Sequence, residues 1–141
     1  MKMLSTNDLR KALTEAANIE SFLSENEEEF TSKEVSDMLL ELFSRKKLSK
    51  STLAKESGIS EVYLHQIFSR KRTPSRNRLL SICLALSATL DETQELLQKS
   101  GYASLYPRNR RDSIIMYALI HGQKPDKVND LLFKIGEDTL F

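Results

Sequence analysis

The sequence predicts an all-helical protein. Only four of its 141 residues are glycine and three are proline, too few for the many tight turns of a β-sandwich or barrel. Hydrophobic residues instead recur at helical spacing along most of the chain. Helix-start signals are also frequent, because a capping residue precedes an acidic residue by three positions at Ser5, Thr31, Thr89 and Asn109.

The helical periodicity and its stop signals place the elements in order. A first helix over residues 6–23 should break near Asn18, and the acidic run from Glu25 to Glu29 forms a linker or an exposed cap. Gly122 ends one of the last two helices and Pro125 begins the other. The remaining helices are predicted over residues 32–45, 50–57, 61–69, 76–86, 91–100, 110–121 and 125–135.

The end of the chain repeats its middle. With a shift of 35 residues, 76–106 lies over 111–141, and Arg76/Arg111, Leu96/Leu131 and Gly101/Gly136 are among the identical pairs. We interpret this as a second helical hairpin stacked on the first, although two amphipathic hairpins can also be similar by chance. The predicted organisation is an N-terminal helical arm (1–31), a central domain (32–106) and a C-terminal hairpin (107–141) that partly repeats 72–106.

Charge is distributed unevenly along the chain. The formal net charge is +1, yet residues 1–44 sum to −6, residues 45–78 to +8 and residues 79–141 to −1. A localised basic segment in a nearly neutral protein is typical of a site for a polyanion. The alternative is an ordinary solvated face rich in lysine and arginine.

Several classes of protein are not expected. No charged n-region precedes an apolar run and no long apolar stretch occurs, so we expect no signal peptide, no membrane contact and a cytoplasmic location. One cysteine and two histidines, with no zinc-ligand spacing, predict no metal and no cofactor. Phosphate-binding loops and hydrolase signatures are also missing, and we therefore expect no enzyme.

Residues 48–78 have the spacing of a helix-turn-helix. Two short helices joined by a tight turn would bury Leu53, Ala54, Leu64 and Ile67 against one another. Gly58 suits the turn because it has no Cβ, and Ile59 would plug the turn into the core. Ser60 is a favourable N-cap for the second helix.

This stretch resembles the XRE family of phage-repressor-like regulators. The resemblance covers about residues 34–100 and rests on Leu-Ala followed by Gly-Ile-Ser, on the basic segment RKRTPS and on the hydrophobic helix RLLSICLAL. It implies a lambda-repressor-like five-helix domain that binds double-stranded DNA, usually as a homodimer on a two-fold operator. Two residues depart from the family pattern, Lys50 where glutamine is common and Arg70 where glycine is common. A left-handed arginine would cost about 1 kcal/mol.

The predicted second helix of the motif would present its polar side to the major groove. Gln66 can pair with adenine, Glu61 can accept from a cytosine amino group, and Val62 can touch a thymine methyl. The predicted base contacts are Glu61, Val62, His65 and Gln66, and the predicted phosphate contacts are Lys50, Ser60, Tyr63, Arg70, Lys71, Arg72 and Arg76. The alternative for the polar residues is a solvated helix face, and Tyr63 could pack at the edge of the domain.

Three other features have simpler interpretations. Cys83 lies among leucines and isoleucines and is interpreted as a small core residue rather than a redox sensor. His121, before Gly122, is interpreted as a helix-end residue. In the loop YPRNRRD, Arg108, Arg110 and Arg111 could touch phosphate or an acidic partner, but structural capping is favoured.

The leading hypothesis is a transcriptional regulator, preferably a repressor, that binds an operator as a homodimer. The alternative is an antitoxin or adaptor that holds a partner protein through the N-terminal arm or the C-terminal hairpin, and a helical scaffold ranks third. The dimer interface is predicted on the C-terminal hairpin, although the same residues could seal the monomer's own core. These residues are Tyr102, Leu105, Tyr106, Leu132, Phe133 and Phe141.

Overall fold

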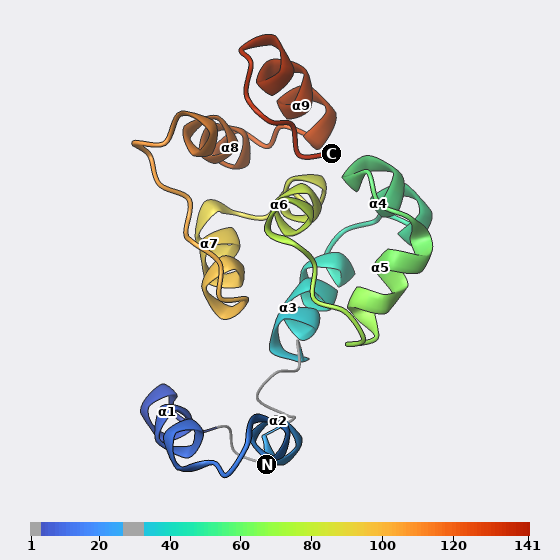
Figure 1. The fold of residues 1–141 in the computed structure, drawn as a ribbon. Coiled ribbons are helices and arrows are strands. Elements are labelled where there is room, and N and C mark those ends of the chain that lie inside the picture. The colour runs from blue at the N-terminus through green and yellow to red at the C-terminus, as the bar shows by residue number, and fades with distance from the viewer. Residues whose placement is uncertain (1–3, 27–32) are drawn as a thin grey trace. The chain divides into compact units, whose positions relative to one another are not determined.

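The computed structural model describes residues 4–26 and 33–141, and within these residues it contains nine helices and no strand (Figure 1). The all-helical prediction is therefore confirmed. Two compact units, residues 1–31 and 32–141, are described separately. The helices are α1 (Thr6–Glu15), α2 (Ile19–Glu25), α3 (Lys33–Ser44), α4 (Lys50–Ser57), α5 (Glu61–Phe68), α6 (Arg76–Ala85), α7 (Leu90–Lys99), α8 (Arg110–Ile120) and α9 (Pro125–Lys134).

The first unit is a pair of short helices. The helix predicted over residues 6–23 does break near Asn18, because the chain leaves the helix after Glu15 and re-enters it at Ile19, and the second piece continues to Glu25. Asn18 causes the restart, since its Oδ1 accepts a hydrogen bond from the Ser21 amide at 2.7 Å. The predicted cap at Thr31 and the acidic residues 27–29 lie outside the described residues.

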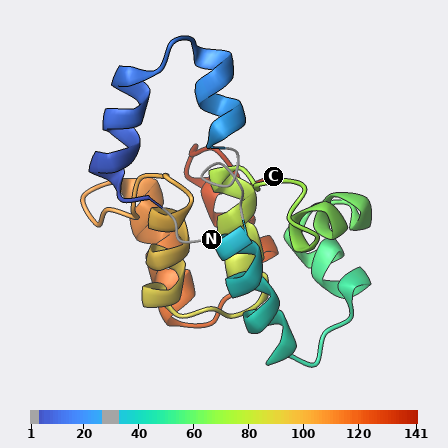
Figure 2. The same cartoon turned by 90° about the horizontal axis from the view of Figure 1, so that it is seen from below.

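Helix α6 forms the centre of the second unit. All seven residues from Leu79 to Ala85 are buried, which is the expected pattern for a helix surrounded by others. Helices α4, α7, α8 and α9 all pack against it (Figures 1 and 2). The core of this unit therefore supports α4 and α5 from one side and the last hairpin from another.

Local capping explains where the helices of the second unit begin. Thr89 and Glu92 form a reciprocal capping box at the start of α7. The backbone hydrogen bond at Thr89, followed by the interaction with Arg45, holds the pKa of the Glu92 carboxyl below its usual range. Asn109 caps α8 by accepting from the Asp112 amide at 2.9 Å. His121 occupies the C-cap position of α8.

The two last helical hairpins, α6–α7 and α8–α9, use the same internal hydrogen bonds at a spacing of 35 residues. Arg76 Nε donates to the Ala103 carbonyl at 3.0 Å, and Arg111 Nε donates to the Asp138 carbonyl at 2.7 Å. In each hairpin, a side-chain amide on the second helix also binds the backbone of the segment that follows that helix. The amide oxygen of Gln94 accepts from the Leu105 amide at 2.8 Å, and that of Asn129 accepts from the Leu140 amide at 2.7 Å.

Candidate nucleic-acid interface

Helices α4 and α5 are joined by a tight turn. Leu53 and Ala54 on α4 and Leu64 and Ile67 on α5 are all buried. Gly58 ends α4 in the left-handed conformation with φ 70°, and the following Ile59 amide donates to the Ala54 carbonyl at 3.1 Å. This geometry is that of a helix-turn-helix, with α5 in the position of the recognition helix.

The outer side of α5 is open to solvent at its N-terminal end. Ser60 starts the helix, since its Oγ accepts from the Tyr63 amide at 3.0 Å. The predicted base contacts Glu61, Val62 and His65 are exposed, and Val62 is the clearest case because 69% of a large hydrophobic residue remains accessible. Gln66 is half-buried. The structure thus brings the four predicted base-contacting residues together on one short helix.

Two arginine side chains stack on the ring of Tyr63, which belongs to α5. The guanidinium carbon of Arg72 lies 4.8 Å from the ring centroid of Tyr63, and that of Arg78 lies 4.4 Å from it. Arg78 was not among the predicted site residues. Its membership of the basic segment was the available signal, but only the fold places it against the recognition helix.

The remaining predicted phosphate contacts fall into two groups. Lys50, at the start of α4, and Lys71, just after α5, are exposed. Arg70 adopts φ 67°, so it does hold the left-handed conformation where glycine is common in the family pattern. Its Nη2 donates to Asp37 Oδ1 at 2.6 Å, which ties the end of α5 to α3.

Arg76 has an internal role rather than a solvent-facing one. Only 25% of its side chain is exposed, and its guanidinium bonds the Ala103 carbonyl and lies 3.4 Å from Asp112 Oδ2. Asp112 is buried and also accepts from the Tyr106 amide at 3.1 Å. Arg76 therefore links α6 to α8, because its hydrogen-bonding groups face the protein.

The arginines of the loop before α8 also differ from one another. Arg111 bonds the Asp138 and Thr139 carbonyls and Asn77, so it is structural. Arg108 and Arg110 are exposed, and Arg110 lies 4.0 Å from Glu137.

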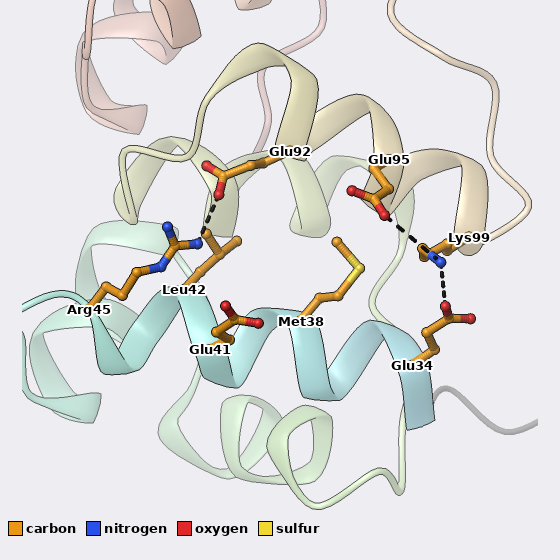
Figure 3. A pocket seen from close by; sticks show the side chains of 8 residues that line it. All are labelled: Glu34, Met38, Glu41, Leu42, Arg45, Glu92, Glu95 and Lys99. Atoms are coloured by element: carbon orange, nitrogen blue, oxygen red, sulfur yellow. Dashed lines mark hydrogen bonds and ion pairs between the residues drawn. The ribbon is translucent and has the colours of Figure 1, made fainter.

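A groove of about 340 Å³ lies between α3 and α7 (Figure 3). Met38 and Leu42 contribute apolar side chains to it, and ion pairs cross it from one helix to the other. Arg45 pairs with Glu92 at 2.8 Å, and Lys99 pairs with Glu34 (Figure 3). These ion pairs link α3 to α7. The charged residues that line the groove therefore have a structural role, and no ligand is needed to account for them.

Cys83 is fully buried in the core. Burial raises the pKa of its thiol to about 12, so the reactive thiolate is disfavoured. Among residues 4–26 and 33–141, no group of three or more histidine, cysteine or acidic side chains is placed to hold a metal. Over the same residues, every helix is too short or too polar to cross a membrane.

The six residues predicted at a dimer interface separate into two sets. Leu105 and Leu132 belong to the buried core, and the hydroxyl of the half-buried Tyr102 donates to the Pro74 carbonyl at 2.6 Å. Tyr106, Phe133 and Phe141 are exposed. Part of this set therefore seals the core of the second unit, as the alternative interpretation expected.

The helical bundle and the outward-facing α5 define a DNA-binding domain of the lambda-repressor-like class. Residues 41–92 match the family model described as helix-turn-helix. The match confirms the XRE-type resemblance for this segment. It supports a DNA-binding regulator in general. No curated protein and no solved structure matches the chain.

Proposed function

We propose that the protein is a sequence-specific transcriptional regulator that reads the major groove with α5. The observation that carries this proposal is the exposed N-terminal face of α5. Exposed basic residues precede this helix in the sequence, at Lys50, and follow it, at Lys71 and Arg72. The first turn of a recognition helix is the part that meets base edges. Its neighbours on the surface would then fix the protein on the phosphate backbone.

Glu61, Val62, His65 and Gln66 are the proposed base-reading residues. A carboxylate, an aliphatic group and a carboxamide can each recognise a different base edge, and a good base contact discriminates by about 1–3 kcal/mol. Gln66 is half-buried, which restricts its rotamers and favours one fixed contact. An exposed valine on a polar helix face is also well suited to a thymine methyl.

The proposed phosphate contacts are Lys50, Ser60, Tyr63, Lys71 and Arg72, with Arg78 added because it lies against Tyr63. Arg70 and Arg76 are proposed as positioning residues, since each is held by a carboxylate of the protein. Arg70 fixes the end of α5 and Arg76 fixes the start of α6. Both would affect DNA binding through the shape of the domain.

The proposal also covers the location, the oligomeric state and the regulatory output of the protein. We infer that the protein acts in the cytoplasm as a homodimer and without catalysis, and that repression is its output. A dimer would place two copies of α5 on two half-sites of an operator, which increases specificity beyond what one short helix can reach.

The test begins with selection of bound duplexes from a random pool, followed by mobility shifts on the selected sequence and on a scrambled duplex. Gln66→Ala and Glu61→Gln should abolish the preference for the selected duplex while leaving salt-dependent affinity for both. The matched control is Gln98→Ala, an exposed glutamine on α7. Thermal unfolding should be unchanged in all three variants. Retained preference in the two α5 variants would refute the site assignment.

A second candidate function is the binding of a partner protein by the first unit. The observation that favours it is the exposure of Leu13, Ile19 and Leu23, each 47–53% accessible on a two-helix unit with one buried hydrophobic residue, Phe22, among its described residues. Co-purification with the product of the adjacent gene, compared between the wild type and Leu23→Asp, tests it. Equal recovery with both proteins argues against this candidate.

A further inference from the structure

The two helices of the helix-turn-helix are held by different parts of the second unit. The recognition helix α5 is tied to α3 by a buried hydrogen bond of 2.6 Å, which the Ser36 hydroxyl donates to the Ile67 carbonyl. Helix α4 is tied to α6, where the Ser81 hydroxyl donates to the Ser57 carbonyl at 2.7 Å. Helix α9 also packs against α4 (Figure 1). The turn that begins at Gly58 therefore joins two helices with separate supports.

The segment after α9 places an aromatic ring on this turn. The ring of Phe141 occupies the space into which a side chain at Gly58 would project. Asn129 on α9 fixes the segment, since its Oδ1 accepts from the Leu140 amide at 2.7 Å and its Nδ2 donates to the Phe141 carbonyl at 3.4 Å. The side chain of Leu140 is buried in the core. The position of the ring is thus set by α9 and by the core beneath it.

The first hairpin has the same local arrangement at the equivalent segment. Gln94 binds both the amide and the carbonyl of Leu105, at 2.8 Å and 2.9 Å. The next residue, Tyr106, is the counterpart of Phe141 at the spacing of 35 residues. An aromatic residue at this position therefore accompanies the fold of both hairpins, and the second hairpin is the one that brings it onto Gly58.

We propose that Phe141 is a positioning residue for DNA reading, because its ring holds the turn and with it the direction of α5. Hydrogen bonds to base edges require donor–acceptor distances of about 2.7–3.2 Å, so a small displacement of α5 would break them. Long basic side chains can follow a displaced phosphate. Loss of the ring should therefore reduce discrimination between sequences more than total affinity. The inference rests on the proposed function and adds a residue that lies outside the matched segment, 41–92.

The experiment measures the affinities of the full chain for the selected duplex and for the scrambled duplex by fluorescence anisotropy. Phe141→Ala should lower the ratio of the two affinities about tenfold, the scale of one lost base contact, while binding to the scrambled duplex stays nearly unchanged. Partial unfolding would lower both affinities by the same factor, so the ratio separates positioning from stability. Asn129→Ala, which releases the segment and keeps the ring, should lower the ratio as well.

Two variants serve as controls for the ring. Phe141→Tyr keeps an aromatic ring, as the counterpart Tyr106 does, and should retain the wild-type ratio. Phe133→Ala removes an aromatic residue of α9 that is 80% exposed, and it should also retain the ratio. An unchanged ratio in Phe141→Ala, or an equal fall in Phe133→Ala, would overturn the proposal.

A second measurement, amide hydrogen exchange of the full chain, needs no DNA. The Gly58 and Ile59 amides donate to the Lys55 and Ala54 carbonyls at 3.2 Å and 3.1 Å. Phe141→Ala should accelerate exchange at these two amides and leave the centre of α6 unchanged, because the opening is local. Equal exchange in the wild type and the variant would overturn the proposal. A wild type without preference for any duplex, combined with accelerated exchange in the variant, would refute the proposed function and leave the hold of the ring on the turn established.

Discussion

The ring of Phe141 lies directly over Gly58, the residue at the turn of the helix-turn-helix. A Cβ built on Gly58 would overlap the Cγ and Cδ atoms of that ring. The end of the second hairpin thus covers the turn that orients α5. Glycine is required at this turn for two separate reasons, the left-handed φ of 70° and the close approach of the ring.

Gly58→Ala should destabilise the protein by about 2–4 kcal/mol, because it adds strain at a positive φ and a clash with Phe141. In the Phe141→Ala background the clash is absent, so the loss should fall to the strain alone, about 1 kcal/mol. Urea unfolding of the four proteins measures the coupling. An equal loss in both backgrounds would show that the ring does not rest on the turn.

The turn and its helices could be predicted from the sequence because their signals are local. Helix α4 has the predicted bounds, since Ser49 caps its start and Gly58 ends it. Recognition of Ser60 as an N-cap likewise needs only neighbouring residues. The break between α1 and α2 was anticipated near Asn18 for the same reason.

The roles of the arginines could not be predicted because they depend on distant partners. Arg70, Arg76 and Arg78 all lie in one basic segment, and their partners are Asp37, Asp112 and Tyr63. Nothing in the spacing of a basic run shows which cations are already paired. The stacking of hairpins sets the partner of Arg76, and this is a tertiary property.

Arg70 offers a test of backbone strain. Arg70→Gly and Arg70→Ala both remove the ion pair with Asp37, so they differ mainly in the cost of the positive φ. The glycine variant should be more stable than the alanine variant by about 1 kcal/mol, the reverse of their order in a helix interior. Thermal and urea unfolding give the comparison. Equal stability, or a more stable alanine variant, would contradict the left-handed conformation.

Arg76→Ala should lower stability by about 1–3 kcal/mol, because it leaves the buried carboxylate of Asp112 without its cation. The salt dependence of DNA binding should stay unchanged if the residue makes no phosphate contact. Arg108→Ala, an exposed arginine in the loop before α8, is the stability control. A normal unfolding midpoint combined with a smaller salt slope would restore the phosphate interpretation of Arg76.

Lys71→Ala and Arg72→Ala should weaken binding to specific and scrambled duplexes alike. Each lost phosphate contact should reduce the slope of log affinity against log salt by about 1. Arg45→Ala is the matched control, since this exposed arginine pairs with Glu92 across the α3–α7 groove. Fluorescence anisotropy at four salt concentrations provides the slopes. If all three variants keep the wild-type slope, the cations beside α5 do not contact DNA.

The most direct test of the account is methylation protection of a duplex selected by the protein. Dimethyl sulfate modifies guanine N7, which is a major-groove atom. We expect the protein to protect guanines within its site, and Gln66→Ala to remove that protection at conditions where it still binds. Unprotected guanines under a fully bound wild-type protein would show that α5 does not occupy the major groove.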